Sequence, residues 1–175
     1  MVIRDYRKED AVAVGLLIKD TYSEFNLDFL EPAELAPYLG PYYYAGDDDT
    51  AHQEAIHGVI LSKFVYVAEV DGAIAGVLRG RMDRLGSLFI GRAYHRQGIG
   101  SSLVDRFEKE VRRNQGTVIR VASSLYAVPF YLRMGYKRST GIRRGWSFQG
   151  HGIPIQPMRK VLELPKEISG SSSTN

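Results

Sequence analysis

The amino-acid sequence predicts an α/β fold with a mixed, largely antiparallel sheet, and three features carry this prediction. Two apolar stretches, 64–70 and 73–81, flank Asp71-Gly72, a dipeptide typical of a tight hairpin turn. An amphipathic helix follows a glycine-containing loop, and a β-branched stretch at 117–122 follows that helix. Several strands precede this loop, whereas a fully parallel sheet would alternate strands and helices from its first turn.

The other elements are placed by apolar spacing and by the residues that end regular structure. The segment 27–50 is expected to be largely irregular, because prolines and glycines interrupt it repeatedly. A short helical segment is expected after residue 122. The expected strands are 2–6, 64–70, 73–81, 85–90, 117–122, 136–148 and 153–164, and the expected helices are 8–25, 31–39, 51–61 and 99–113.

Length and composition limit the classes of protein to consider. The 175 residues suit one domain, expected over 1–165, followed by a disordered tail over 166–175. The absence of cysteine excludes disulfides, thiolate metal sites and an acyl-cysteine intermediate. His52 and His57 have no third ligand in reach, so no metal site is expected. Without a long apolar run or a signal-peptide core, the expected location is cytoplasmic.

Charge is distributed unevenly along the chain. Residues 1–78 hold 5 Lys and Arg against 14 Asp and Glu, a net charge of −9. Residues 79–175 hold 18 against 6, a net charge of +12. The basic half suits an anionic cofactor, and the acidic half suits a cationic substrate. The alternative is that most of these charges lie on solvated helix faces.

The loop 95–101, His-Arg-Gln-Gly-Ile-Gly-Ser, has the features of an anion site. It joins a strand to a helix whose first turn carries unpaired N–H groups and the positive end of the helix dipole. A P-loop is excluded because no Lys follows Gly100, and the dinucleotide fingerprint lacks its third glycine. We therefore expect the loop to bind the diphosphate of a ligand that is recognised by neither a P-loop nor a dinucleotide-binding fingerprint.

Two segments and the last strand carry a family resemblance. Residues 94–100, Tyr-His-Arg-Gln-Gly-Ile-Gly, resemble a pyrophosphate-binding motif, Gln/Arg-x-x-Gly-x-Gly/Ala. Residues 127–136, Ala-Val-Pro-Phe-Tyr-Leu-Arg-Met-Gly-Tyr, resemble an Ala-x-x-Phe-Tyr-x-x-x-Gly-Phe/Tyr segment. Residues 157–162 resemble the strand that ends such domains. In this order and spacing, the segments resemble the GNAT superfamily of acetyl-CoA-dependent N-acetyltransferases. His95 departs from the pattern, since the family usually has Gln or Arg there.

The resemblance implies a GNAT-like domain with a mixed, mostly antiparallel central sheet flanked by helices, and acetyl-CoA as cosubstrate. In this family the pantetheine arm lies along a strand edge like an added strand. The resemblance assigns the pantetheine arm to Leu88, Phe89 and Ile90, and the diphosphate to Arg96, Gln97, Gly98, Ile99, Gly100 and Ser101.

The resemblance also suggests catalytic residues. Tyr131 matches the tyrosine that commonly protonates the leaving thiolate, and an ordinary phenol pKa of about 10 suits that role. Some family members carry a Glu on or near the fourth strand, but residues 85–88 of this chain, Leu-Gly-Ser-Leu, contain no carboxylate. Asp83 is the nearest acid and is our candidate base, with Glu69 as an alternative. Ser123 and Ser124 could instead hold a water or the substrate.

The acceptor pocket has one candidate wall. Residues 42–44 are three tyrosines, and 47–49 are three aspartates. The resemblance places them in the segment that often shapes the acceptor pocket, where aromatic and acidic groups would suit a cationic amine. The alternative is a surface loop with inward tyrosines and solvated aspartates.

The function that the resemblance implies is acetyl transfer to a primary amine by direct attack in a ternary complex. One alternative is a non-catalytic acetyl-CoA binding or sensing domain of the same fold, which would not need Tyr131. A nucleic-acid binder is disfavoured because the basic residues lack interleaved aromatics. The expected partners are acetyl-CoA and an unidentified amine, with neither nucleic acid nor membrane. A homodimer through the C-terminal strands is a further hypothesis.

Overall fold

A computed structural model describes residues 1–145, 148 and 151–163 and contains one sheet. The strand order is β1-β2-β3-β4-β5-β8-β6, and β7 also pairs with β8. All pairings are antiparallel except that of β4 with β5, so the predicted fold class is confirmed. The strands are β1 Val2–Asp5, β2 Phe64–Val70, β3 Ala73–Arg81, β4 Arg84–Ile90, β5 Val118–Ser124, β6 Lys137–Arg138, β7 Arg143–Arg144 and β8 Pro154–Val161.

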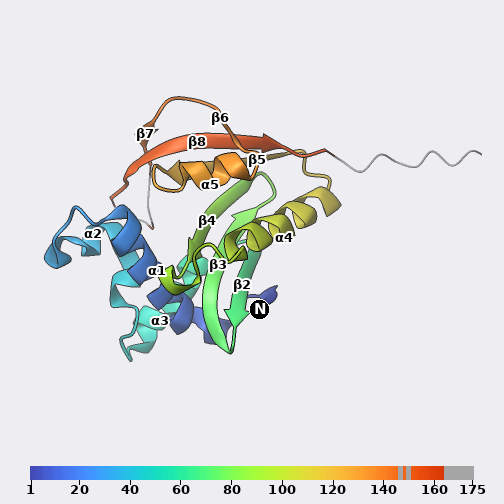
Figure 1. The fold of residues 1–175 in the computed structure, drawn as a ribbon. Helices are drawn as coiled ribbons and strands as arrows, with labels where there is room; N and C mark the ends of the chain where they lie inside the picture. The colour runs from blue at the N-terminus through green and yellow to red at the C-terminus, as the bar shows by residue number, and fades with distance from the viewer. Residues whose placement is uncertain (146–147, 149–150, 164–175) are drawn as a thin grey trace, which may run out of the picture.

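Helices cover both faces of this sheet (Figure 1). The α-helices are α1 Ala11–Asn26, α2 Ala36–Leu39, α3 Thr50–Ile60, α4 Ile99–Arg113 and α5 Val128–Arg133. Short 3-10 turns precede α1 and flank α2, so the expected helix at 31–39 is broken into two pieces. None of the described helices is long and apolar enough to cross a bilayer.

The two faces have separate cores, each built from a helix stripe and one side of the strands. On one face, α1 contributes Val14, Ile18 and Tyr22, whose spacing of four keeps them on one side of the helix. On the other face, Leu103 and Phe107 of α4 are fully buried. The sheet is therefore held rigidly between α1 and α3 on one side and α4 and α5 on the other.

The parallel pairing of β4 with β5 is short, and the two strands are unpaired beyond it. Only Arg84 and Leu85 of β4 pair with β5. Directly after them, Arg79 of β3 pairs with Ser87 and Gly80 pairs with Leu85, so that Gly86 has no partner residue on β3. A bulge of this kind bends its strand and ends regular pairing. Residues 86–90 of β4 consequently have an edge that is not paired with β5.

The C-terminal strands differ from expectation. Residues 136–148 were predicted as one strand, but β6 and β7 are separate two-residue pieces that pair with different parts of β8. The interruption lies opposite Pro157, which has no N–H to donate, and the side-chain amide of Gln156 donates to the Thr140 carbonyl there (2.6 Å). The predicted tail, 166–175, lies outside the described residues.

A buried ion pair joins α4 to β8 across the core. Both carboxylate oxygens of Glu108 lie 2.8 Å from the Lys160 Nζ, and Arg112 donates to the same carboxylate (3.2 Å). The Glu108 side chain is only 3% exposed, so its charge depends on these partners rather than on water.

Replacement of Lys160 by Met is expected to destabilise the fold. The change removes the Lys160 hydrogen bonds to Glu108 and leaves the Arg112 ion pair, and we expect a loss of about 2 kcal/mol in the free energy of unfolding, the range of hydrogen bonds to a charged group. Urea unfolding measures this loss. The matched control is Arg113→Met, which breaks an exposed pair with Glu110 and should cost less than about 0.5 kcal/mol. Equal losses for the two variants would contradict a structural role for the buried pair.

Candidate functional site

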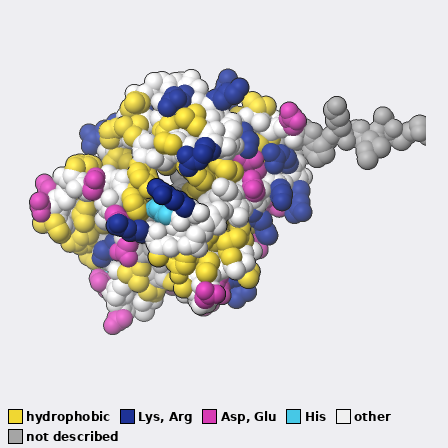
Figure 2. Space-filling model, viewed as in Figure 1, with side chains coloured by type: hydrophobic (Ala, Val, Ile, Leu, Met, Phe, Trp, Pro, Cys, Tyr) yellow, Lys and Arg dark blue, Asp and Glu magenta, His cyan; other side chains and the backbone are white. Residues whose placement is uncertain are grey.

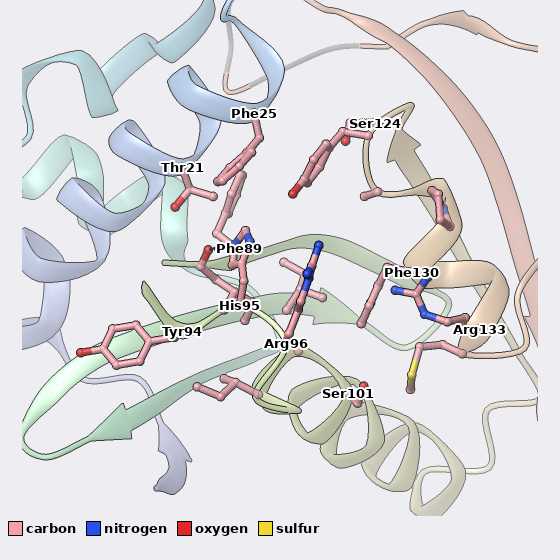
Figure 3. A pocket seen from close by; sticks show the side chains of 18 of the residues that line it. Thr21, Phe25, Phe89, Tyr94, His95, Arg96, Ser101, Ser124, Phe130 and Arg133 are labelled. Carbon is pink, nitrogen blue, oxygen red and sulfur yellow. Dashed lines mark hydrogen bonds between the residues drawn. The ribbon is translucent and has the colours of Figure 1, made fainter. Parts of the chain in front are cut away.

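A cavity of about 640 Å³ opens where the unpaired edge of β4 meets the start of α4. Eight of the nine residues predicted to bind the cofactor line it, and only Gln97 is not among the described lining residues. The eight are Leu88, Phe89, Ile90, Arg96, Gly98, Ile99, Gly100 and Ser101. In Figure 2, Lys and Arg side chains gather around the hollow on this face. Figure 3 shows the cavity between α1, the loop before α4, and α5.

The floor of this cavity is suited to an anion. The first intrahelical hydrogen bond of α4 runs from Ser102 N to Gly98 O (3.0 Å), so the preceding amides are free to donate to a ligand. Gly98 adopts φ +79° and Arg96 adopts φ +61°, and these left-handed conformations turn the chain sharply into the helix. Arg96 and Arg133 place two cationic side chains beside these amides (Figure 3).

The two segments that carried the family resemblance touch each other at this cavity. A β-carbon built on Gly100 would lie 3.3 Å from the Phe130 ring, so the first turn of α4 packs directly against α5. A larger side chain at position 100 would have to displace the ring, because 3.3 Å is already tight. Gly100 therefore sets the distance between the anion site and α5.

His95 holds the loop to the end of β4. Its Nε2 lies 2.8 Å from the Ile90 carbonyl oxygen, a geometry in which the ring nitrogen donates. The ring packs against Phe25 at 4.9 Å between centroids, and Phe25 in turn stacks on Tyr126. His95 thus positions the loop through a hydrogen bond to the backbone rather than capping α4 with its side chain.

A second cavity, of about 210 Å³, continues from the first into the gap between β4 and β5. The two cavities share residues of α1, β4 and β5, and the shared set is Asn26, Leu88, Phe89, Ser124 and Ala127. Beyond Leu85, neither β4 nor β5 pairs across this gap. The unpaired edge of β4 is therefore available to a ligand that forms main-chain hydrogen bonds.

Tyr131 lines this second cavity and is firmly fixed. Gly135 adopts φ +85° after α5, and Tyr136 N then donates to Tyr131 O (2.9 Å), which ends the helix in a Schellman motif. Burial raises the pKa of the Tyr131 hydroxyl above its ordinary value of 10, so the assumption of an ordinary phenol pKa was wrong. The hydroxyl keeps its proton throughout the neutral range and can serve as a donor.

Asp83 does not lie at this site. It occupies the turn between β3 and β4, at the end of β4 that is paired with β5, and it lines neither cavity. Its carboxylate is half-exposed and lies near Arg81 (3.4 Å) and Arg120 (3.6 Å). The proximity in sequence that suggested Asp83 as a base was misleading, because the strand carries the chain away from the turn. Glu69 also lies outside both cavities, paired with Arg4.

The aromatic and acidic segment 42–49 does not form a wall of either cavity. Tyr42 is fully buried in the core, and Tyr44 stacks on His52 at 4.3 Å. The Asp49 side chain accepts a hydrogen bond from Ala51 N and caps α3. Outside this segment, the rings of Tyr38 and His151 contact each other, and they line neither cavity. The interpretation as a surface loop with inward tyrosines holds for Tyr42, whereas Tyr44 is 44% exposed.

Some lining residues were not identified from the sequence. Thr21, Phe25 and Asn26 come from the end of α1, which the sequence marks only as an amphipathic helix. Arg79 lines the second cavity, and the sequence marks it only as a charged residue within the predicted strand 73–81. Among the described residues, no group of three or more acidic or histidine side chains is arranged to hold a metal.

Comparison with known proteins agrees with this geometry. Residues 46–162, about two thirds of the chain, match the acetyltransferase (GNAT) domain family. That range contains the glycine loop, Tyr131 and the last strand. No curated protein sequence matches the chain.

Solved structures share the fold at low sequence identity. A GCN5-related N-acetyltransferase from Rhodopseudomonas palustris superposes with a TM-score of 0.72 at 20% identity, covering 92% of this chain and 95% of its own. The PaiA N-acetyltransferase of Thermoplasma acidophilum, solved with coenzyme A, gives 0.69 at 16% identity, with 92% and 98% covered. A ribosomal-protein-alanine N-acetyltransferase from Brucella melitensis gives 0.59 at 16% identity, with 93% and 100% covered. The chain belongs to the GNAT acetyltransferase family and is an acyltransferase.

Proposed function

We propose that this protein transfers the acetyl group of acetyl-CoA to a primary amine by direct attack within a ternary complex. The observation that carries the proposal is the continuity of the two cavities. An anion site at the start of α4 leads along an unpaired strand edge into a gap that contains a buried tyrosine. The anion site, the strand edge and the gap follow one another in the same order as the diphosphate, the amide-containing arm and the thioester of acetyl-CoA.

The donor is held by backbone groups more than by side chains. The free amides at the start of α4 receive the diphosphate, and Arg96 and Arg133 add charge. The pantetheine amides pair with the unpaired edge of β4 around Leu88 and Ile90, whose side chains pack against the core. Gln97 is exposed and its side chain donates to Ala93 O, so we assign it no side-chain contact with the donor.

The chemistry occurs where the two cavities meet. The neutral amine attacks the thioester carbonyl carbon, and backbone N–H groups of the β4 edge stabilise the oxyanion. The C–S bond then breaks, and the departing thiolate takes the proton of Tyr131. The Tyr131 phenol is protonated at neutral pH even at its ordinary pKa of about 10, so its proton is available for this step. The proton that the attacking amine loses passes through water to the Tyr131 phenolate and restores the phenol for the next turnover.

The amine proton leaves without a side-chain base. None of the described residues that line the second cavity is a carboxylate or a histidine. Ser123 and Ser124 lie in the wall, and the Ser123 hydroxyl donates to the Ser124 carbonyl (2.8 Å). We therefore assign proton removal to water held at these serines, in place of Asp83. The cytoplasmic location and the homodimer stay predictions.

The proposal is tested by release of free thiol from acetyl-CoA with a panel of primary amines. We expect saturable acetyl-CoA binding and thiol release that depends on the amine, with the acetylated amine found by mass spectrometry. Hydrolysis without an acceptor is the control. Tight binding of acetyl-CoA with no amine-dependent release would overturn the proposal and favour the sensing function.

Substitution of Tyr131 by Phe tests the role of the phenol. The variant keeps the buried ring, so we expect acetyl-CoA affinity to change little while kcat falls about 100-fold. The matched control is Tyr44→Phe, which removes a hydroxyl from a half-exposed ring outside both cavities and should leave kcat unchanged. Unchanged turnover in the Tyr131→Phe enzyme would contradict proton donation by this residue.

A further inference from the structure

The second cavity contains a cationic side chain, Arg79, that has no anionic partner among the residues the structure describes. Arg79 is the one charged residue among its described lining residues. The Nε of Arg79 is buried and has no hydrogen-bond partner. Within the described part of the chain, Arg79 forms neither an ion pair nor a side-chain hydrogen bond, whereas Arg81 on the same strand pairs with Asp83. A buried N–H of a charged group that remains unpaired costs stability, so such groups normally have a partner.

The fold holds Arg79 in this position. Arg79 is paired between Val65 of β2 and Ser87 of β4, well inside the sheet. Gly86 packs against the same residue from β4, since a β-carbon built on Gly86 would lie 3.3 Å from the Arg79 carbonyl oxygen and 3.8 Å from its Cγ. The glycine at the bulge therefore lies directly beside the base of the Arg79 side chain.

Among the described residues, the remaining wall of the cavity offers no negative charge to balance Arg79. The other polar lining side chains are neutral: Tyr22, Asn26, Ser87, Ser123, Ser124 and Tyr131. An acceptor with several positive charges would meet one more positive charge and, in the part of the wall that the structure describes, no carboxylate. An acceptor with an acid group would supply the missing partner, because a guanidinium binds a carboxylate through short charge-assisted hydrogen bonds.

We propose that Arg79 selects an acceptor amine that carries a carboxylate, so that the substrate class is an amino acid or a similar small amino acid-like compound. This inference rests on the proposed function, because it assigns the second cavity to the acceptor. Arg79 binds the carboxylate while the amine faces the thioester. It is a specificity residue, and the acetyl transfer itself does not require it.

Matched pairs of acceptors test the proposal. Leucine is compared with isoamylamine, phenylalanine with phenethylamine and lysine with cadaverine, with kcat/KM expressed per unprotonated amine. We expect the amino acid to be preferred by about 10- to 100-fold in at least one pair, the range of a charged hydrogen bond. The Arg79→Gln enzyme should lose most of this preference, mainly through KM. The Arg81→Gln control changes an exposed arginine of the same strand and should keep the preference.

Several results would overturn the proposal. Equal or better use of the decarboxylated amines by the wild-type enzyme would contradict it, even if the Arg79→Gln variant did not fold. An equal fall in kcat for both members of each pair would assign Arg79 to the oxyanion instead.

A binding measurement separates this proposal from the proposed function. If no amine is acetylated, the proposed function fails, and calorimetry with N-acetylleucine and N-acetylisoamylamine on the coenzyme A complex still tests Arg79. Tighter binding of N-acetylleucine that is lost in Arg79→Gln supports a carboxylate site. Equal binding of the two compounds overturns it.

Discussion

The structure depends on the point at which β4 and β5 stop pairing. The two strands pair only through Arg84 and Leu85 of β4, and Gly86 then interrupts the register with β3. A continuous parallel pair would fill the sheet and leave no strand edge for a ligand. Because the bulge bends β4 away, one short segment in the middle of the sheet gains unpaired backbone groups. Both cavities border that segment.

Contacts around this opening link groups that are distant in sequence. Gly100 brings the first turn of α4 against Phe130 of α5, and the Schellman motif at Gly135 then fixes Tyr131 within the gap. His95 attaches the loop to β4 at Ile90. The anion site, the strand edge and the phenol are thus positioned by contacts between segments that are distant in sequence.

Most of the fold could be predicted from local sequence signals, and the site only in part. Asp71-Gly72 marked its hairpin correctly, and the apolar spacing from Ile99 marked α4. The residues of the loop before α4 could be predicted because Gly98 and Gly100 form part of a recognisable local motif. Arg79 and the α1 residues Phe25 and Asn26 could not be predicted, because their place in the site results from packing between segments that are distant in sequence. The prediction of Asp83 as the base failed for the same reason. Asp83 precedes β4 in the sequence but lies at the end of β4 that pairs with β5, away from the unpaired edge at 86–90.

The central claim is that the edge of β4 beyond Gly86 and the start of α4 receive the cofactor. Hydrogen exchange followed by mass spectrometry, with and without saturating coenzyme A, tests it directly. The account predicts slower exchange in peptides covering 86–90 and 98–102, and unchanged exchange in β2, which is paired on both sides. Binding of coenzyme A without protection of these two segments, or with protection confined to other strands, would contradict the account.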